Sequence, residues 1–392
     1  MSQLETGQLK THTPETGQLK AGGSIQRAFV SLPDPRARGG KRHNLAAMLT
    51  IAVCAVICGS ASWTDIAEFG RAKKEWFESF LHLPHGIPSH DTFGRVFAII
   101  EPEAFERCFG QWVKGLVKAG KGTLVGIDGK TLKHSFDKAA GKAAIHMVSA
   151  FASANRTVFG QVATDAKSNE ITAIPKLIKL LDLKDAIVTI DAMGCQKAIA
   201  KAIRGAGAHY VLAVKENQKT LHAKIKTLLD EAIALNFKGM EGDCFQECCK
   251  GHGRVEIRTC WCTPEVDQLR DIGHWPGLAS AVAVDGERII DGKPVTHRRY
   301  FISSLPGDDA ETLAQAIRGH WGIENPLHWS LDVTFMEDAC RVRVGHAAEN
   351  LSRLRRMSLN MLQRETSRKI SIRAKRLRAG WDHNYLLLIL QT

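Results

Sequence analysis

The sequence predicts an α/β protein with a helical N-terminal part, a core of alternating strands and helices, and a β-rich insertion within that core. Before residue 120 apolar residues recur with the period of a helix. After residue 123 short apolar runs of strand length alternate with amphipathic stretches of helix length. From residue 237 to residue 305 the helical period is absent and strand-like alternation replaces it.

The two N-terminal segments differ in how much apolar surface they can bury. Residues 1–24 repeat ETGQLK with almost nothing apolar between the copies, so we expect a disordered tail. Residues 25–120 are expected to form a helical domain and are a candidate for DNA binding. The expected helices are Leu45–Cys58, which is apolar but shorter than the roughly 17 to 25 residues of a membrane span, Trp63–Phe80, and Thr92–Ile100 capped by Ser89.

Residues 121–236 are expected to form the first part of the core, in the order βββαβαβα. Turn residues separate the three opening strands, and a helical period follows the third strand and each later one. The expected strands are Leu124–Ile127, Ile145–Ala152, Thr157–Ala163, Ala186–Ile190 and Tyr210–Val214, and the expected helices are Glu170–Leu181, Gln196–Arg204 and Gln218–Leu235.

Residues 237–305 are expected to form the β-rich insertion, with turns at Asp285-Gly286 and Asp291-Gly292. Residues 306–350 return to the core with a helix that Asp308 and Asp309 cap. The expected insertion strands are Phe245–Cys249, Val255–Cys262, Ala279–Val284 and Arg299–Ser304, and the core helix is expected from about Ala310 through Glu324, continuing if Pro326 is tolerated.

The charge distribution predicts a polyanionic partner. Lys and Arg number 53 against 41 Asp and Glu, and the resulting charge of +12 favours nucleic acid or an anionic membrane surface. Most of the excess lies in a basic C-terminal region, residues 351–392. There Arg353, Arg355 and Arg356 are candidate DNA phosphate contacts, with a solvated helix as the alternative. The first residues lack an apolar signal core, so we expect a cytoplasmic protein with reduced thiols.

Two aspartates stand at the ends of predicted strands. Asp128 follows Leu124–Ile127 and Asp191 follows Ala186–Ile190, and open α/β sheets gather their ligands at such positions. If the two strands are neighbours, the carboxylates converge, and Glu324 from the later helix would complete an oxygen site suited to Mg²⁺. The alternative for either aspartate is a helix cap or a loop residue.

Short blocks along the chain resemble the DDE transposases of the ISAs family of bacterial insertion sequences, which includes the H-repeat-associated proteins. The resemblance extends from about Ser31 to Asn360. It is carried by GIDGKT at 126–131, NEI at 169–171, TIDA at 189–192, VKENQ at 214–218, HWGIEN at 320–325, LHWSLDV at 327–333 and ED at 337–338.

The resemblance implies an RNase H-like catalytic core with Asp128, Asp191 and Glu324 as the catalytic and metal-binding triad for Mg²⁺ or Mn²⁺. It implies cleavage of double-stranded DNA at the element ends and joining of the 3′ hydroxyl to target DNA at one two-metal site. Pairing two DNA ends implies a homodimer or larger assembly on DNA, and no membrane partner is expected. An RNase H-like nuclease without strand transfer and a domesticated or inactive DNA-binding protein are the alternatives.

The chain departs from the wider superfamily around Glu324. Related transposases carry Tyr, Arg and Lys where this chain has Ile317, His320 and Leu331, so those roles are not carried over. Asp332, Glu337 and Asp338 compete with Glu324 for the third acid, and Glu324 is preferred because it alone lies in the IEN block.

Several other residues invite interpretation. Lys215, Arg254 and Arg318 are candidate DNA contacts, and a surface salt-bridge ladder is the alternative for Arg254 with Glu256 and Arg258. Trp321 and Trp329 are expected to pack in the core, with stacking on DNA bases as the alternative. A zinc site at His320, Glu324 and His328 is possible by spacing but is not favoured. A second zinc site, in a group of five cysteines, is not favoured either, and buried thiols on strands are the preferred interpretation. The group is Cys244, Cys248, Cys249, Cys260 and Cys262.

Overall fold

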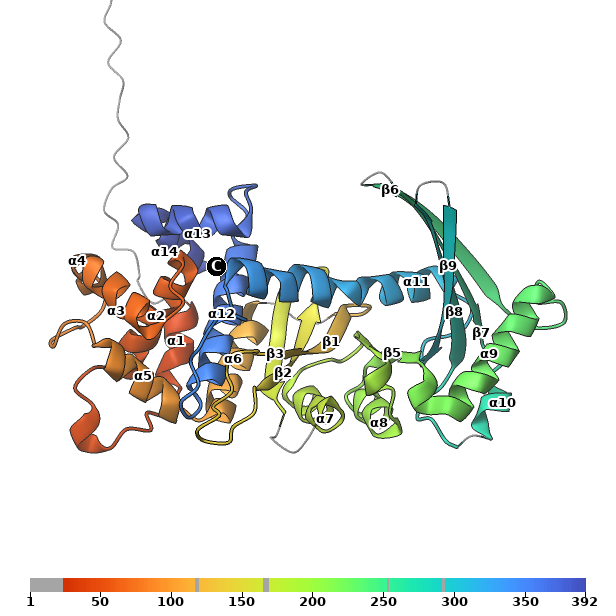
Figure 1. Cartoon of the computed structure of the whole chain (residues 1–392), viewed down its shortest axis with the longest axis horizontal. Helices are drawn as coiled ribbons and strands as arrows, with labels where there is room; N and C mark the ends of the chain where they lie inside the picture. Colours follow the sequence, from red (N-terminus) through yellow and green to blue (C-terminus); the bar gives the residue numbers. More distant parts are fainter. Residues whose placement is uncertain (1–23, 117–119, 165–168, 252–253, 272, 291–292) are drawn as a thin grey trace, which may run out of the picture.

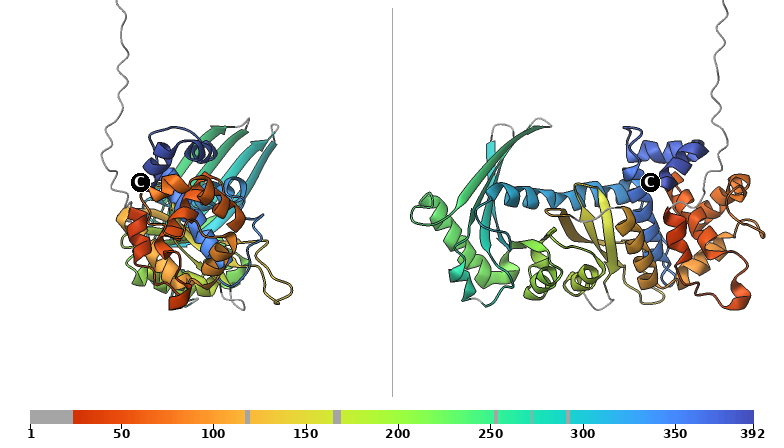
Figure 2. Two further views of the ribbon diagram at one scale, coloured as in Figure 1. Left: turned by 90° about the vertical axis from the view of Figure 1, so that its left-hand side faces the viewer. Right: turned by 180° about the vertical axis from the view of Figure 1, so that it is seen from behind.

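The computed structural model describes residues 24–116, 120–164, 169–251, 254–271, 273–290 and 293–392. The predicted tail, except for its last residue, and the Asp291-Gly292 turn lie outside the described residues. The molecule is elongated, with helices at one end, the insertion at the other and the core between them (Figures 1 and 2).

The N-terminal segment is helical, as predicted. Ser89 caps α5 by accepting the backbone N–H of Thr92. The helix expected over Trp63–Phe80 is instead two helices that meet at Lys73, and Ser62 with Asp65 forms a capping box at the start of the first. The helices are α1 Ser24–Val30, α2 Leu45–Cys58, α3 Trp63–Ala72, α4 Lys74–Glu78, α5 His90–Ile99 and α6 Pro102–Leu116, with a short 3-10 turn at Arg38–Gly40.

The C-terminal region packs against these N-terminal helices. Helix α12 (Ala347–Arg364) contacts α2, α5 and β3, and α13 (Ile372–Trp381) contacts α2. Helix α14 (His383–Gln391) closes the group, and Figure 1 shows α12 passing between the N-terminal helices and the sheet. The first and last segments of the chain therefore share one apolar core.

One nine-stranded sheet runs through the core and the insertion, in the order β3-β2-β1-β4-β5-β9-β8-β7-β6. The pairs β1–β4 and β4–β5 are parallel, and the other pairs are antiparallel. Because β9 pairs with β5, the insertion continues the core sheet. The strands are β1 Leu124–Thr131, β2 His146–Ala152, β3 Thr157–Ala163, β4 Ile187–Ile190, β5 His209–Val214, β6 Asp243–Gly251, β7 Arg254–Thr263, β8 Ser280–Ile290 and β9 Lys293–Ser303.

The order βββαβαβα predicted for the first part of the core is observed. The helices are α7 Glu170–Leu180, α8 Lys197–Gly205 and α9 Lys219–Ala234, with short 3-10 turns at Ala192–Gly194 and Glu216–Gln218; the insertion adds α10 Asp267–Arg270. The expected turn at Asp285-Gly286 is wrong, because both residues lie inside β8. Gly286 is needed there for close packing, since a Cβ would overlap the His297 ring on β9.

A helix crosses the face of the sheet between the insertion and the N-terminal helices (Figure 1). It begins as α11 (Ala310–Gly319), where Asp309 accepts the backbone N–H of Thr312, and continues as a π-helix, η4 (Ile323–Thr334). Pro326 is tolerated inside η4, where the wider turns of a π-helix replace the usual hydrogen-bond pattern.

Among the described helices, none alone combines the length and apolar character of a membrane span. Helices α2 and α3 pass that test only as a pair, bent by 98°.

Candidate active site

Asp128 and Asp191 occupy adjacent positions on neighbouring strands. Ile127 on β1 pairs in parallel with Ile190 on β4, so each aspartate is the next residue after a paired position. The condition stated from the sequence, that the two strands are neighbours, is therefore met. Asp128 lies inside its strand rather than past its end, because β1 continues to pair with β2 as far as Thr131.

Helix η4 covers this end of the two strands. His320, at the end of α11, has its Nδ1 3.0 Å from Thr189 Oγ1 on β4, and His328 Nδ1 lies 3.6 Å from Asp128 Oδ2 on β1. Glu324 is four residues from each histidine and is exposed. It lines a cavity of about 170 Å³ together with Asp191. The helix therefore brings its acid to the carboxyl edge that holds both aspartates.

The environment of Asp128 disfavours its charged form. Burial, with the nearby carboxylates of Glu170, Asp191 and Glu324, raises the pKa of Asp128 to about 7, although the backbone N–H of Gly129 stabilises the carboxylate. Burial, with Arg356 and Lys130 nearby, lowers the pKa of His328 to about 4, so this imidazole is neutral at pH 7 and does not compensate the charge. The site thus gathers carboxylates, and no described Lys or Arg forms an ion pair with Asp128.

Asp191 is both a cap and a candidate ligand. Its Oδ1 accepts the backbone N–H groups of Met193 and Gly194, which hold the side chain at the start of the 3-10 turn. The sequence's alternative of a helix cap for this aspartate is therefore correct, and its Oδ2 accepts no hydrogen bond from the residues that the structure describes.

The donor set suits a hard divalent cation. Asp128, Asp191 and Glu324 offer the carboxylate oxygens that Mg²⁺ and Mn²⁺ prefer, and a cation would relieve the repulsion that raises the pKa of Asp128. In the part of the chain that the structure describes, no three His, Cys, Asp or Glu side chains already form a group able to hold a metal. Neither zinc arrangement considered above is formed either.

The competing acids are held elsewhere. Lys130 Nζ lies 2.7 Å from Asp332 Oδ1 and 2.6 Å from Asp338 Oδ1. Glu337 is fully buried and 3.1 Å from Arg356 Nη1. Although burial opposes it, the guanidiniums of Arg356 and Arg355 lower the pKa of Glu337. These ion pairs favour Glu324, which forms no ion pair with the residues that the structure describes, as the acid available to a substrate or cation.

Two hydrogen bonds of His146, on the strand next to β1, lie beside Asp128. His146 Nε2 on β2 is 2.6 Å from Glu170 Oε1, and His146 Nδ1 is 2.8 Å from Thr131 Oγ1. A Cβ at Gly129 would overlap both the Glu170 carboxylate and the His146 ring, which explains a glycine directly after Asp128. Glu170 and Thr131 lie in two of the blocks that carry the family resemblance, but neither residue was assigned a role from the sequence.

The prediction that Arg353, Arg355 and Arg356 contact DNA phosphates is wrong. All three lie on α12 and are at most 2% exposed. Arg353 binds Glu106 and Glu349, each at 2.8 Å, and Arg356 binds Glu337. They are buried because α12 packs between the N-terminal helices and the sheet, where only paired charges are tolerated.

The other expected DNA contacts have separate outcomes. Lys215 is exposed and lines the cavity that holds Asp191 and Glu324. Arg318 pairs with Glu247 on β6, and its guanidinium also donates to the Cys249 sulfur at 3.3 Å. The side chain of Arg254 lies outside the described residues, and its neighbours Glu256 and Arg258 form an ion pair of 2.6 Å, part of the salt-bridge ladder considered from the sequence.

The aromatic and sulfur expectations are partly wrong. Trp321 and Trp329 are 40% and 59% exposed, so they do not pack in the core. Cys260 and Cys262 are buried on β7, as expected, whereas Cys244 and Cys248 on β6 are exposed. Strand β6 is the edge of the sheet, so its outward side chains lack a covering layer.

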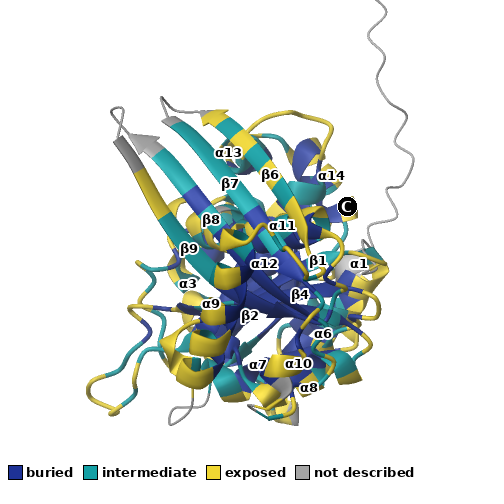
Figure 3. Ribbon diagram, turned by 90° about the vertical axis from the view of Figure 1, so that its right-hand side faces the viewer, coloured by how far each residue is buried: buried dark blue, intermediate teal, exposed yellow. Residues whose placement is uncertain are grey.

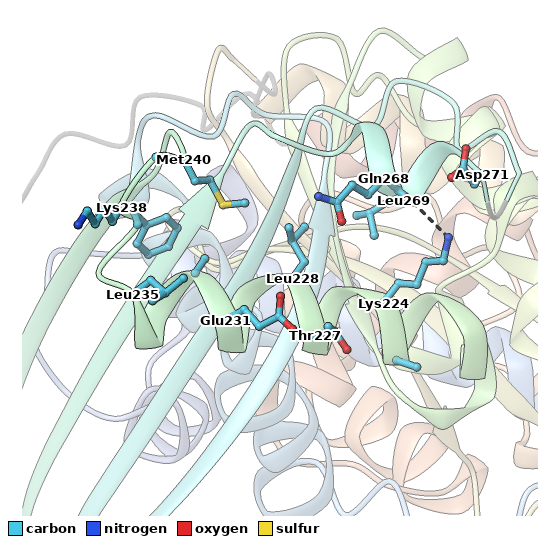
Figure 4. Close-up of a pocket in the computed structure, with 14 residues that line it drawn as sticks. Lys224, Thr227, Leu228, Glu231, Leu235, Lys238, Met240, Gln268, Leu269 and Asp271 are labelled. Atoms are coloured by element: carbon cyan, nitrogen blue, oxygen red, sulfur yellow. Dashed lines mark hydrogen bonds between the residues drawn. The ribbon is translucent and has the colours of Figure 1, made fainter.

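A second cavity, of about 610 Å³, lies on the outer side of the insertion between α9 and α10 (Figure 4). Lys224, Glu231 and Asp271 line it together with apolar side chains such as Leu228 and Met240. None of the three candidate acids contributes to it, so it is separate from the carboxylate edge.

Comparison with known proteins identifies the family of this chain. A family model described as "Transposase DDE domain" matches residues 119–361, and one described as "DDE_Tnp_1-associated" matches residues 26–113. Similar proteins include "Putative protein YbfL" of Escherichia coli K12, 41% identical over 92% of this chain and 95% of that protein, and "H repeat-associated putative transposase YhhI" of the same strain, 40% identical over the same shares. "Putative transposase YncI" of Escherichia coli O157:H7 is 42% identical over 91% of each chain. This chain therefore belongs to the DDE transposase family.

Proposed function

We propose that this protein cuts double-stranded DNA at the ends of an insertion sequence and joins the freed 3′ hydroxyl to target DNA, with Asp128, Asp191 and Glu324 as its catalytic acids. The observation that carries the proposal is the position of these three acids at one edge of the sheet: Asp191 and Glu324 line one cavity, and both raise the pKa of Asp128 on the neighbouring strand. The family supplies the substrate class, DNA.

The topology supports an RNase H-like core. The strand order β3-β2-β1-β4-β5, with β1, β4 and β5 parallel, places the first two acids on adjacent central strands. This arrangement agrees with what the family resemblance implies for the fold, and the insertion β6–β9 then extends the same sheet. We propose that the chain divides in the same way as the sequence predicted. The parts are a helical part at 25–120, core parts at 121–236 and 306–350, the insertion at 237–305 and a C-terminal region at 351–392.

Two divalent ions, Mg²⁺ or Mn²⁺, held by the three carboxylates would supply activation of the attacking oxygen and stabilisation of the leaving oxygen. The chain's own residues contribute the scaffold. Asp191 is held in place by Met193 and Gly194 through their backbone N–H groups, and His320 links the helix that carries Glu324 to Thr189 on β4. Such anchoring fixes the directions in which the acids point.

The test is cleavage of a plasmid that carries the flanking ends of the element, with Mg²⁺ and with EDTA. Wild-type protein is expected to cut only with Mg²⁺, and Glu324→Gln is expected to lose cutting while keeping its fold, because Glu324 is exposed. The matched control is Glu231→Gln on α9, an acid that lines the separate outer cavity.

Metal-dependent cutting that survives Glu324→Gln would reject the assignment of this acid. Cutting without joining would reject strand transfer and favour a nuclease, and DNA binding without any cutting would favour an inactive descendant. We further propose a homodimer or larger assembly on DNA in the cytoplasm, since two ends must be held together; sedimentation with and without end DNA tests the assembly.

A further inference from the structure

The insertion presents one charged face toward the active-site side of the sheet. Directly opposed residues of antiparallel strands point to the same face, and the register opposes Glu247 with Arg258, and Glu256 with Arg288. The same register places His297 and Arg299 of β9 on that face, since Gly286 opposes both Arg258 and His297. Figure 3 shows that this projecting part of β6–β9 is only partly covered.

Arg299 differs from its neighbours on this face. Arg258 and Arg288 each pair with Glu256, and Arg318 from α11 pairs with Glu247. Within the part of the chain that the structure describes, Arg299 has no carboxylate partner. Its guanidinium donates to His297 Nε2 at 3.0 Å and lies 5.4 Å from the centre of the exposed Trp321 ring.

Arg299 also lies next to the carboxylate edge. On β5 and β9, Val214 opposes Tyr300, so Lys215 and Arg299 are the next residues beyond that pair. Both line the cavity of about 170 Å³ that Asp191 and Glu324 line. Across one face of the sheet, the acids of β1 and β4 are thus followed by two cations on β5 and β9.

The charges around Arg299 favour binding of an anion. Burial, with Arg288 and Arg258 nearby, lowers the pKa of Arg299, whereas Glu256 and Glu324 raise it. The Arg299 guanidinium is half-buried, lies over the Trp321 ring and has no carboxylate partner among the described residues. Its N–H groups that do not bind His297 can therefore bind a ligand. Planar guanidinium donors match the oxygens of a phosphate.

We propose that Arg299, with Lys215 beside it, binds a backbone phosphate of the DNA strand that enters the carboxylate edge and so positions that strand against Asp191 and Glu324. The proposal rests on the proposed function for the identity of the ligand as DNA. It gives Arg299 a role in substrate binding that the sequence did not reveal, because Arg299 lies 108 residues after Asp191.

The experiment measures binding of the full-length protein to a fluorescein-labelled mixed-sequence DNA duplex by anisotropy over a series of KCl concentrations, in EDTA. Loss of one phosphate contact is expected to reduce the slope of log K against log salt by about 0.9 and to weaken binding roughly eightfold at about 0.1 M salt. Arg299→Gln and Arg299→Met should both show this change, Met keeping an apolar stem over Trp321. Arg299→Lys should keep a slope close to that of the wild type.

The matched control is Lys226→Gln, which removes one positive charge from α9. Lys226 pairs with Asp230, which also binds Arg298 from the opposite face of β9. This variant should keep the wild-type slope. A structural role of Arg299 would change the melting temperature without changing the slope in variants that remain folded.

The outcomes separate the two proposals. A wild-type slope in folded Arg299→Gln or Arg299→Met overturns the phosphate contact, even if the wild-type protein cuts DNA. A reduced slope in both supports it, even if no cutting is seen and the proposed chemistry fails. If the wild-type protein does not bind duplex DNA, both proposals fall.

Discussion

Replacing Asp128 by Asn is expected to stabilise the folded protein at pH 8 while abolishing cutting. The carboxylate is buried among other acids, and its pKa rises from 3.8 to about 7 on folding. At about 1.4 kcal/mol per pH unit, this difference corresponds to about 4 kcal/mol at most. Since the side chain keeps 19% of its surface exposed and the surroundings can relax, we expect a gain of about 2 kcal/mol in the free energy of unfolding.

The pH dependence of this gain has a definite sign. The folded state binds the Asp128 proton more tightly than the unfolded state does, so ionisation costs stability as pH rises from about 4 to about 7. Asn carries no such cost. The gain of Asp128→Asn should therefore grow through this window, stay constant above pH 7, and largely disappear at pH 4.5.

Urea unfolding in EDTA, followed by circular dichroism at pH 4.5 and pH 8, measures the gain. Asn can still accept the backbone N–H of Gly129, so the variant keeps that hydrogen bond. Equal or lower stability of Asp128→Asn at pH 8 would refute the electrostatic reasoning. Added Mg²⁺ should stabilise the wild-type protein more than the variant at pH 8, because a bound cation stabilises only the form that binds it.

Three further outcomes follow from the packing. Glu337→Gln should destabilise the fold by about 3 to 5 kcal/mol in urea unfolding, because it leaves Arg356 buried without its carboxylate; an effect below about 1 kcal/mol would contradict the buried pair. Arg353→Ala should cost a similar amount by removing the partner of Glu106, yet any folded fraction should keep the wild-type salt dependence of DNA binding. Ser62→Ala should lower the free energy of unfolding by about 1 kcal/mol, because it removes the capping box of α3. Thermal melting measures this loss, and Ser79→Ala, which lies outside the capping box, is the control.

Much of the fold could be predicted because it depends on local pattern. The core helix Leu45–Cys58 and the strand Thr157–Ala163 have the predicted bounds, since apolar period and turn residues are properties of neighbouring positions. The positions of Asp128 and Asp191 after apolar strands also indicated that the two carboxylates converge if those strands are neighbours, and β1 does pair in parallel with β4. Glu324 needed the family resemblance, because periodicity alone did not separate it from the later acids.

The sequence by itself determined the element order, the strand positions of the two aspartates and the excess of positive charge. Only the tertiary structure decided where that charge lies, because a side chain's partners come from distant segments. Arg353 is buried against Glu106, 247 residues earlier, whereas Arg299 lies beside Lys215 through the register of β9 on β5. Burial and strand register are set by packing across the whole chain, so a count of basic residues could not tell a structural arginine from one available to DNA.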